Sequence, residues 1–371
     1  MYYGFILTHC MYPIDKRLEL KNCCFDNPRT SQEIKAVAQI LKKANFIGNA
    51  AFPETYKQFG KEVISLEMII DKFFERYNLD RKYLLKKNGK EYSDIYYKMA
   101  KNWVILRYDE SNDFQYTDYG YKKYKEVIAY INLLTFLSFS NNSYRNDSLL
   151  IPECFDFFEI KSIDKTIHNI IINLLVLSTA RSDEEETNDF KYCLFNKIYH
   201  KFFELENLIR KSGNEEVIKY ISDNISNYIS MEDKKMRIMS LVSILELLMT
   251  HKPDSNRYNI EDSIRKQFSN TMLVLLYLND KDICYIEIEK YLLMIYDIRS
   301  AIAHGSFEQI EIIAKKMDKW LLNNNVDYKK YYEGFDLDIV FDYIDESLRD
   351  YVRIAIERFL KDKNLIELLK K

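Results

Sequence analysis

Residues 284–305 read CYIEIEKYLLMIYDIRSAIAHG, and this stretch carries the clearest structural pattern in the chain. One set of its residues recurs at alternating spacings of four and three positions: Cys284, Ile288, Tyr291, Ile295, Ile298 and Ile302. That spacing places them on one stripe of an α-helix, and we expect the stripe to be buried. Gly305 follows the last turn and predicts a helix C-terminus at His304.

The rest of the chain favours a mainly α protein with two domains. Its 371 residues include only 8 Gly and 5 Pro, against 30 Tyr and 22 Phe. Such a composition argues against collagen-like, disordered and turn-rich β architectures, and the length exceeds a single typical core. We expect an N-terminal α+β domain over residues 1–160 and a helical domain over residues 161–371, with an Asn-rich linker at 140–148.

Local patterns place the elements within these domains. Ser31 is expected to cap a helix carrying Ile34, Val37, Ile40, Leu41 and Ala44, and residues 63–77 predict a second helix. Residues 103–120 look like two short strands around a polar turn, similar to the wing of a winged-helix module. In the second domain, spacings of three and four predict helices from 167 and at 190–209, 217–229, 236–249, 260–278, 284–302 and 351–369.

The 284–305 helix also carries polar groups that a core helix does not need. Leu293, Asp297, Ser300 and His304 form a second ridge, away from the apolar stripe. Arg299 lies on the flank of the stripe, where a guanidinium must find a partner or face a groove. His304 is expected at the helix C-terminus, where the macrodipole favours its protonated form.

Two segments together resemble the HEPN superfamily, and in particular its Apea-like branch. The phrase IYDIRSAIAHG, residues 295–305, has the Arg-x4-His spacing of that signature. The upstream phrase MRIMSLVSILELL, residues 236–248, resembles the branch because Glu246 lies in an otherwise apolar helix ahead of the Arg-x4-His helix. The resemblance spans residues 232–325 and, more loosely, 161–371.

This resemblance implies an antiparallel helical bundle, commonly a homodimer, in which two Arg-x4-His motifs meet across the interface. Its nuclease members are endoribonucleases that need no metal or other cofactor. By this resemblance Arg299 would clamp the scissile phosphate of RNA, and His304 would transfer a proton during attack by the ribose 2′-hydroxyl. The products would carry 2′,3′-cyclic phosphate and 5′-hydroxyl ends. The N-terminal domain would sense a trigger or restrain the nuclease, with an antitoxin or other regulatory partner, as in toxin and antiviral defence systems.

The residue types suit this chemistry. An imidazole titrates near neutral pH, and a guanidinium stays charged and can grip two phosphate oxygens. Arg299 and His304 lie roughly 140° apart around an ideal helix, so a site built from two copies is expected. Glu246 and Asp297 are candidates to orient Arg299 or His304, although Glu246 could equally serve only to neutralise a buried arginine. Ser300 stands where many active members carry Asn, Asp or His.

A second hypothesis remains open: a non-catalytic helical dimerisation module that binds nucleic acid or a partner protein. It draws on Ser300, on the formal net charge of −3 and on the hairpin at 103–120. Under this hypothesis, alanine at His304 would change nothing.

Other signals are weaker. His9, Cys10, Cys23 and Cys24 suggest a zinc site, but adjacent cysteines do not give the usual C-x2-C chelate, so no metal is expected. The 6 cysteines are too sparse for a disulfide framework and suggest reduced thiols in a cytoplasmic protein. His168 and His200 lie in apolar helical patterns and are expected to be packing residues. No apolar stretch is long enough to cross a membrane.

Overall fold

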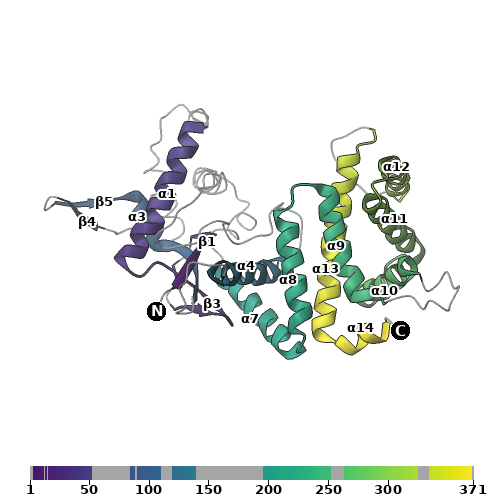
Figure 1. Ribbon diagram of the computed structural model, residues 1–371, viewed down its shortest axis with the longest axis horizontal. Helices are drawn as coiled ribbons and strands as arrows, with labels where there is room; N and C mark the ends of the chain where they lie inside the picture. Colours follow the sequence, from purple (N-terminus) through teal and green to yellow (C-terminus); the bar gives the residue numbers. More distant parts are fainter. Residues whose placement is uncertain are drawn as a thin grey trace. The chain divides into compact units, whose positions relative to one another are not determined.

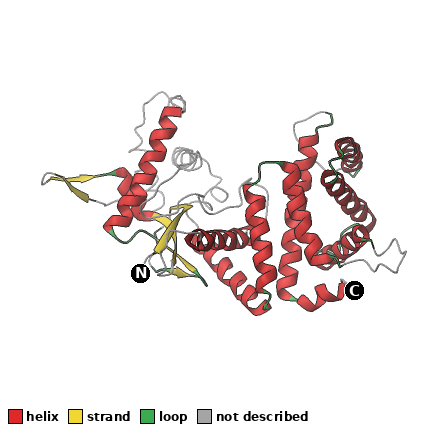
Figure 2. Cartoon of the chain, in the orientation of Figure 1, coloured by secondary structure: helices red, strands yellow, loops and turns green. Residues whose placement is uncertain are grey.

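The computed structural model describes residues 3–11, 13–14, 16–51, 84–87, 90–109, 119–138, 195–251, 263–324 and 334–369. This part of the chain is mainly helical, with a small antiparallel sheet near the N-terminus (Figure 1). All the strands assigned to the described residues come before residue 110 (Figure 2). The expected mainly α fold with an N-terminal α+β part is therefore confirmed at this level.

The chain divides into two compact units. Unit 1 comprises Met1–Ile131 and Ser148–Glu206, and unit 2 comprises Asn132–Asp147 and Asn207–Lys371. The divisions at 131 and 206 fall inside helices α4 (Tyr119–Ser138) and α7 (Phe195–Ser212). The boundary expected at residue 160 lies outside the described residues, as do the linker at 140–148 and the helices expected at 63–77 and from 167.

A four-stranded antiparallel sheet organises unit 1. Its strands are β1 (Tyr3–Met11), β6 (Trp103–Asp109), β3 (Cys23–Asp26) and β2 (Leu18–Glu19), in that order across the sheet. Strand β6 has a continuous buried run from Trp103 to Tyr108, which is typical of a central strand covered on both faces. A separate hairpin joins β4 (Leu84–Lys87) to β5 (Lys90–Ser93).

The hairpin expected over residues 103–120 is only partly within the described structure. Its first strand is β6, but β6 is hydrogen-bonded along both edges to β1 and β3 rather than to a strand that follows it. Residues 110–118, the second half of the expected hairpin, lie outside the described residues, and α4 begins at Tyr119. Because β1 and β3 occupy both of its edges, β6 is not one half of the two-stranded hairpin that the local pattern suggested.

Two helices of unit 1 begin at side-chain caps. Helix α1 (Ser31–Ala51) starts one residue earlier than expected, because Thr30 rather than Ser31 accepts the backbone N–H of Glu33. The Glu33 carboxylate accepts the N–H of Thr30 in return, which completes a capping box. In α3 (Ile95–Asn102), Asp94 accepts the N–H groups of Tyr96 and Tyr97. The α1 residues expected to be buried, Ile34, Val37, Ile40 and Leu41, are buried, while the Ala44 side chain is not described.

Unit 2 is built from helices. They are α8 (Glu215–Ser230), α9 (Lys234–Met249), α10 (Ile264–Asn279), α11 (Tyr285–Ala303), α12 (Phe307–Asn323), α13 (Leu337–Lys361) and α14 (Lys363–Leu369). Helix α9 lies beside both α8 and α13 (Figure 1). The helices expected at 190–209, 217–229, 236–249, 260–278 and 284–302 correspond to α7 through α11.

The C-terminal part of unit 2 departs from the sequence analysis in two places. Helix α12 was not expected, although its buried residues Ile310, Ala314, Met317 and Leu321 follow the same spacing of three and four. The single helix expected at 351–369 is instead the last part of α13, which begins at Leu337, followed by α14 after a break at Asp362.

A polar cluster joins α8, α9 and α13. One terminal nitrogen of Arg237 donates to Asp345 at 2.8 Å, and the Tyr228 hydroxyl donates to the same carboxylate at 3.0 Å. Such a paired and hydrogen-bonded cluster fixes the register of the three helices. None of the helices in the described ranges combines the length and apolar character that crossing a bilayer would require.

Candidate functional site

The apolar stripe of α11 is buried only in its middle. Tyr291, Ile295 and Ile298 are buried, whereas Ile288 and Ile302 are half-buried and Cys284 is exposed. Cys284 is the residue that precedes the helix, so it lies before the part of α11 that packs on its neighbours. The expectation that the whole stripe is buried is therefore wrong at its ends. The buried residues at its centre pack α11 against the neighbouring helices and so position its last two turns.

The end of α11 forms as the sequence predicted. His304 occupies the C-terminal cap, and Gly305 has a φ of 64°, in the left-handed region that glycine adopts without strain. Gly305 N–H donates to the Ile302 carbonyl and Ser306 N–H donates to the Ala301 carbonyl. This pair of bonds is the Schellman motif, which satisfies the last carbonyls of a helix. It fixes the backbone of His304, whose side chain is exposed.

Arg299 is held by Glu246 of the neighbouring helix. A terminal nitrogen of Arg299 donates to Glu246 Oε2 at 2.8 Å, and the two side chains are 25% and 18% exposed. The pair was anticipated from the sequence, because Glu246 was proposed as a partner that orients or neutralises this arginine. Nε of Arg299 is buried and has no acceptor among the described residues. The ion pair thus engages one nitrogen of the guanidinium and leaves its other N–H donors without an acceptor among the described residues.

Tyr296 completes this group. Its ring lies 5.9 Å from the Arg299 guanidinium carbon, and Glu246 accepts a hydrogen bond from its hydroxyl. Burial, the charge of Glu246 and that hydrogen bond raise the pKa of Tyr296 to about 12, so the phenol stays protonated near neutral pH. Tyr296 was not singled out from the sequence. Its position three residues before Arg299, on the same helix face, is the signal that identifies it.

Asp297 has a different partner from the one proposed. Its carboxylate accepts two hydrogen bonds from Arg265 of α10, at 2.7 and 2.8 Å, and contacts neither Arg299 nor His304. This corrects the expectation that Asp297 orients one of those two residues. The physical reason is geometric: Asp297 lies on the α10 side of α11, where a guanidinium can form a bidentate pair with it. No sequence signal identified Arg265.

The described structure gives Ser300 and His304 no side-chain hydrogen bond. Ser300 is half-buried, one turn from His304, and only its backbone carbonyl bonds to the cap. The Lys235 ammonium at the start of α9 lies 5.5 Å from the centre of the Phe307 ring, just beyond His304. The Glu246–Arg299 pair thus joins the last turn of α9 to α11, and the Lys235 contact joins the first turn of α9 to the start of α12. Arg299 therefore faces α9, whereas His304 caps α11 with an exposed side chain.

The residues weighed as zinc ligands are only partly described. Cys23 and Cys24 are buried in β3, and burial raises the pKa of both thiols, that of Cys24 to about 11. The side chains of His9 and Cys10 are not described. Within the described ranges, no three His, Cys, Asp or Glu side chains are grouped so that they could hold a metal ion. His200 is exposed rather than packed, and His168 lies outside the described residues.

Comparison of the chain with known proteins gives no match to a family model, to a curated protein or to a solved structure.

Proposed function

We propose that the chain is a metal-independent endoribonuclease of the HEPN type, whose reacting groups are Arg299 and His304. The observation that carries the proposal is the arrangement at the end of α11. A guanidinium attached to Glu246 through one nitrogen and an exposed imidazole lie within two turns of each other at the end of α11. A guanidinium so held keeps N–H groups for a phosphate, and an exposed imidazole can exchange protons.

The roles of the two groups follow from their chemistry. The guanidinium of Arg299 would stabilise the charge that develops on the phosphate oxygens as the ribose 2′-hydroxyl attacks. The imidazole of His304 would take the proton from that hydroxyl or give one to the leaving 5′-oxygen. Glu246 and Tyr296 would position Arg299 through the ion pair and the ring contact. Asp297 would act only at a distance, through its pair with Arg265.

A homodimer is part of the proposal. Met236 and Leu247 of α9 and Phe307 at the start of α12 are exposed apolar side chains on or beside the helices that carry Glu246 and His304. Exposed apolar groups around a polar centre are typical of a surface that another protein covers. A second copy seated there would bring a second Arg-x4-His motif to the first. The regulatory role of the N-terminal part, an antitoxin and a place in defence remain parts of the same proposal.

The test is RNA cleavage by the purified full chain in EDTA. We expect cleavage that survives chelation and yields 5′-hydroxyl ends, which polynucleotide kinase labels without prior phosphatase treatment. His304→Ala and Arg299→Ala should each lower the rate by at least about a hundredfold, the scale of a lost acid–base or electrostatic group. His200→Ala removes another exposed histidine and should leave the rate unchanged.

Mixing the two inactive variants tests the composite site. If Arg299 of one copy works with His304 of the other, mixed Arg299→Ala and His304→Ala proteins should recover about a quarter of the wild-type rate. The reason is that half of randomly mixed dimers are heterodimers, each with one intact site. Absolute dependence on a metal, or unchanged cleavage in both variants, would contradict the nuclease and favour the non-catalytic module.

A further inference from the structure

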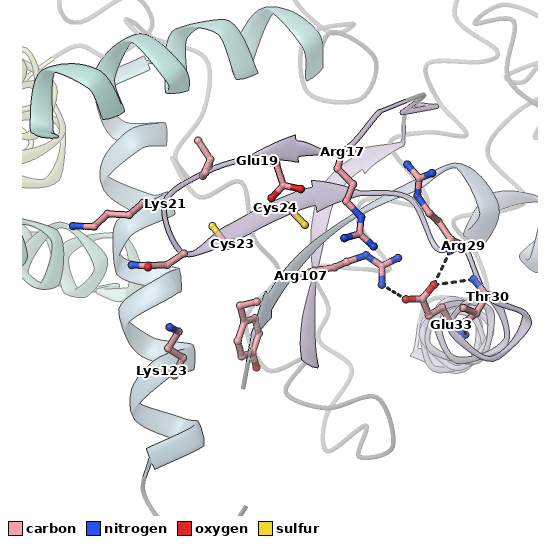
Figure 3. Close-up of a pocket in the computed structure, with 13 residues that line it drawn as sticks. Arg17, Glu19, Lys21, Cys23, Cys24, Arg29, Thr30, Glu33, Arg107 and Lys123 are labelled. Carbon is pink, nitrogen blue, oxygen red and sulfur yellow. Dashed lines mark hydrogen bonds and ion pairs between the residues drawn. The ribbon is translucent and has the colours of Figure 1, made fainter. Parts of the chain in front are cut away.

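Unit 1 contains a pocket of about 540 Å³ that the site on α11 does not use. It is lined by the β2–β3 hairpin, the start of α1, strand β6 and one residue of α4, all within unit 1 (Figure 3). Its volume falls in the range of about 300–1,000 Å³ that small-molecule sites occupy. Of its lining residues, only Cys23 and Cys24 carried a signal in the sequence, as possible zinc ligands.

Three arginines at this pocket share one carboxylate. Arg17 Nε donates to Asp26 at 3.1 Å, Arg29 Nε donates to the same side chain at 2.8 Å, and Arg107 Nε lies 3.3 Å from it. Asp26 is 0% exposed, whereas the side chains of Arg17 and Arg29 are 52% and 47% exposed. The Asp26 carboxylate therefore lies beneath the guanidinium groups, and the exposed parts of Arg17 and Arg29 face the pocket.

Arg17 is the clearest available donor. It contacts Asp26 through Nε, and no described residue accepts a hydrogen bond from its two terminal nitrogens. A guanidinium presents five N–H donors in a planar fork, so a ligand can use the ones that Asp26 does not. The buried Arg107 is fixed in turn by Glu33 and by the Asn27 carbonyl, so the floor of the pocket is rigid.

The start of α1 does not supply the site. The Glu33 carboxylate already accepts the backbone N–H groups of Arg29 and Thr30, as Figure 3 shows. A ligand anion would therefore meet side chains rather than the helix N-terminus.

Charge around the pocket favours an anion. Five basic side chains line it against two acidic ones, Glu19 and Glu33. The buried Asp26 and Glu206 lie beside it, so an excess of one positive charge remains even when both are counted. The two cysteines add no charge near neutral pH, because burial raises the pKa of both thiols. Lys21 and Lys123 come from a turn and from α4, away from the arginine cluster in Figure 3.

We propose that this pocket binds a small phosphorylated ligand, of nucleotide size, with its phosphate groups on Arg17 and Arg29. A planar guanidinium binds phosphate oxygens in pairs, and buried carboxylates keep the arginines in place before the ligand arrives. Cations on two sides of the pocket suit a ligand with more than one negative group. The inference does not depend on the nuclease, because the site lies wholly in unit 1 and its test measures binding alone.

Calorimetric titration of the full chain tests this inference, with ADP, pyrophosphate and orthophosphate as probes and adenosine as the uncharged control. We expect ADP or pyrophosphate to bind at low salt and adenosine to give no heat. Arg17→Gln removes the outward donors and should weaken binding by roughly ten- to a hundredfold, the scale of a charge-assisted hydrogen bond. Lys123→Gln should weaken binding several-fold. Lys35→Gln, an exposed lysine of α1 outside the pocket, should bind like the wild type.

The different probes distinguish which class of phosphorylated ligand the pocket binds. Tighter binding of ADP than of pyrophosphate indicates a nucleotide, and equal binding indicates inorganic or other small phosphates; both support the inference. No binding of any phosphate probe at millimolar concentration would overturn it. Equal affinity of a phosphate probe for the wild type, Arg17→Gln and Lys123→Gln would also overturn it. A third contradicting result would be a His304→Ala protein that binds a 5′-hydroxyl RNA oligomer but neither ADP nor pyrophosphate. Circular dichroism checks that each variant is folded.

Discussion

Unit 1 and unit 2 each hold an arginine against a carboxylate, but they do so in opposite ways. In unit 1, Asp26 is 0% exposed and three guanidinium groups converge on it. In unit 2, Glu246 and Arg299 form a one-to-one pair whose side chains are 18% and 25% exposed. The first arrangement is a buried network on which the sheet and α1 depend. The second is a partly exposed pair that can change partner without disturbing a core.

The same pairing of arginine with carboxylate serves two purposes. A buried carboxylate shared by several cations makes their positions rigid, and removing its charge weakens several charge-assisted hydrogen bonds at once. A partly exposed pair contributes less to stability, because water already screens its charges. We therefore infer that Asp26 is needed for the structure of unit 1. Glu246 holds Arg299 through one hydrogen bond at a partly exposed position.

The two tryptophans of the chain allow this comparison to be measured. Trp103 is buried in unit 1, and Trp320 lies in unit 2, stacked on Tyr291. A Trp320→Phe protein therefore reports the unfolding of unit 1 by fluorescence, and a Trp103→Phe protein reports that of unit 2. Each substitution below is compared with its own single-tryptophan parent.

The largest effect is expected from Asp26→Asn. Asparagine keeps the shape but loses the charge that three arginines share, so unit 1 should lose about 1.5–3 kcal/mol of stability, the scale of a hydrogen bond to a charged group. Urea unfolding followed by Trp103 fluorescence measures this loss. Asp94→Asn is the matched control, because asparagine caps a helix such as α3 as well as aspartate does. A loss below about 1 kcal/mol for Asp26→Asn would contradict the buried network.

A smaller effect is expected from Glu246→Gln. Glutamine can still accept a hydrogen bond from Arg299, so unit 2 should lose about 1–2 kcal/mol, measured by urea unfolding with Trp320. Asp297→Asn is the control on the same surface. Asp297 and Arg265 are both 39% exposed, and their pair should contribute less than about 1 kcal/mol. Equal losses for the two variants would remove the distinction between Glu246 and Asp297.

A further difference appears only in alkali, where both units should lose stability as the pH rises. In unit 1 the pKa of Cys24 is raised from 9.0 to about 11 by burial. In unit 2 the pKa of Tyr296 is raised from 10.0 to about 12, first by burial. Between the lower and the higher value, the folded protein keeps a proton that the unfolded chain has lost. The free energy of unfolding therefore keeps its full value below the unfolded-state pKa and falls as the pH rises from that pKa to the folded-state pKa.

The two units should begin to weaken at different pH values, unit 1 from about pH 9 and unit 2 from about pH 10. Urea midpoints of the two single-tryptophan proteins, measured from about pH 8 to about pH 11, check the order. Cys24→Ser should reduce the slope for unit 1 only, and Tyr296→Phe should reduce it for unit 2 only. Identical slopes in all four proteins would show that neither group is linked to unfolding.

Much of unit 2 could be predicted because its signals are local. The three- and four-residue spacing marked α7 through α11, and the tripeptide Ala-His-Gly marked the end of α11 on local grounds alone. The Glu246–Arg299 pair was also anticipated, since a guanidinium beside a buried stripe requires a partner. Helix α12 was missed even though its pattern is equally regular, and the cap of α1 was placed one residue late.

Other features had no local signal. Asp297 was expected near Arg299 or His304, yet which neighbour it meets depends on how α10 packs against α11. Residues 103–109 read as part of a hairpin, but sheet pairing joins them to strands about 80 to 100 positions away. The three arginines on Asp26 come from separate positions, the most distant being Arg107, so no sequence window contains them together.

Local sequence was enough to predict helices α7 through α11, the end of α11 at His304 and the need of Arg299 for a partner, because these depend on residues within a few turns of one another. Tertiary packing set the pairing of Asp297 with Arg265, and it placed Asp26 beneath a basic pocket and Glu246 at a partly exposed position. Ion pairs join side chains that packing brings within about 4 Å, and residues far apart in the chain acquire that proximity only when the core forms.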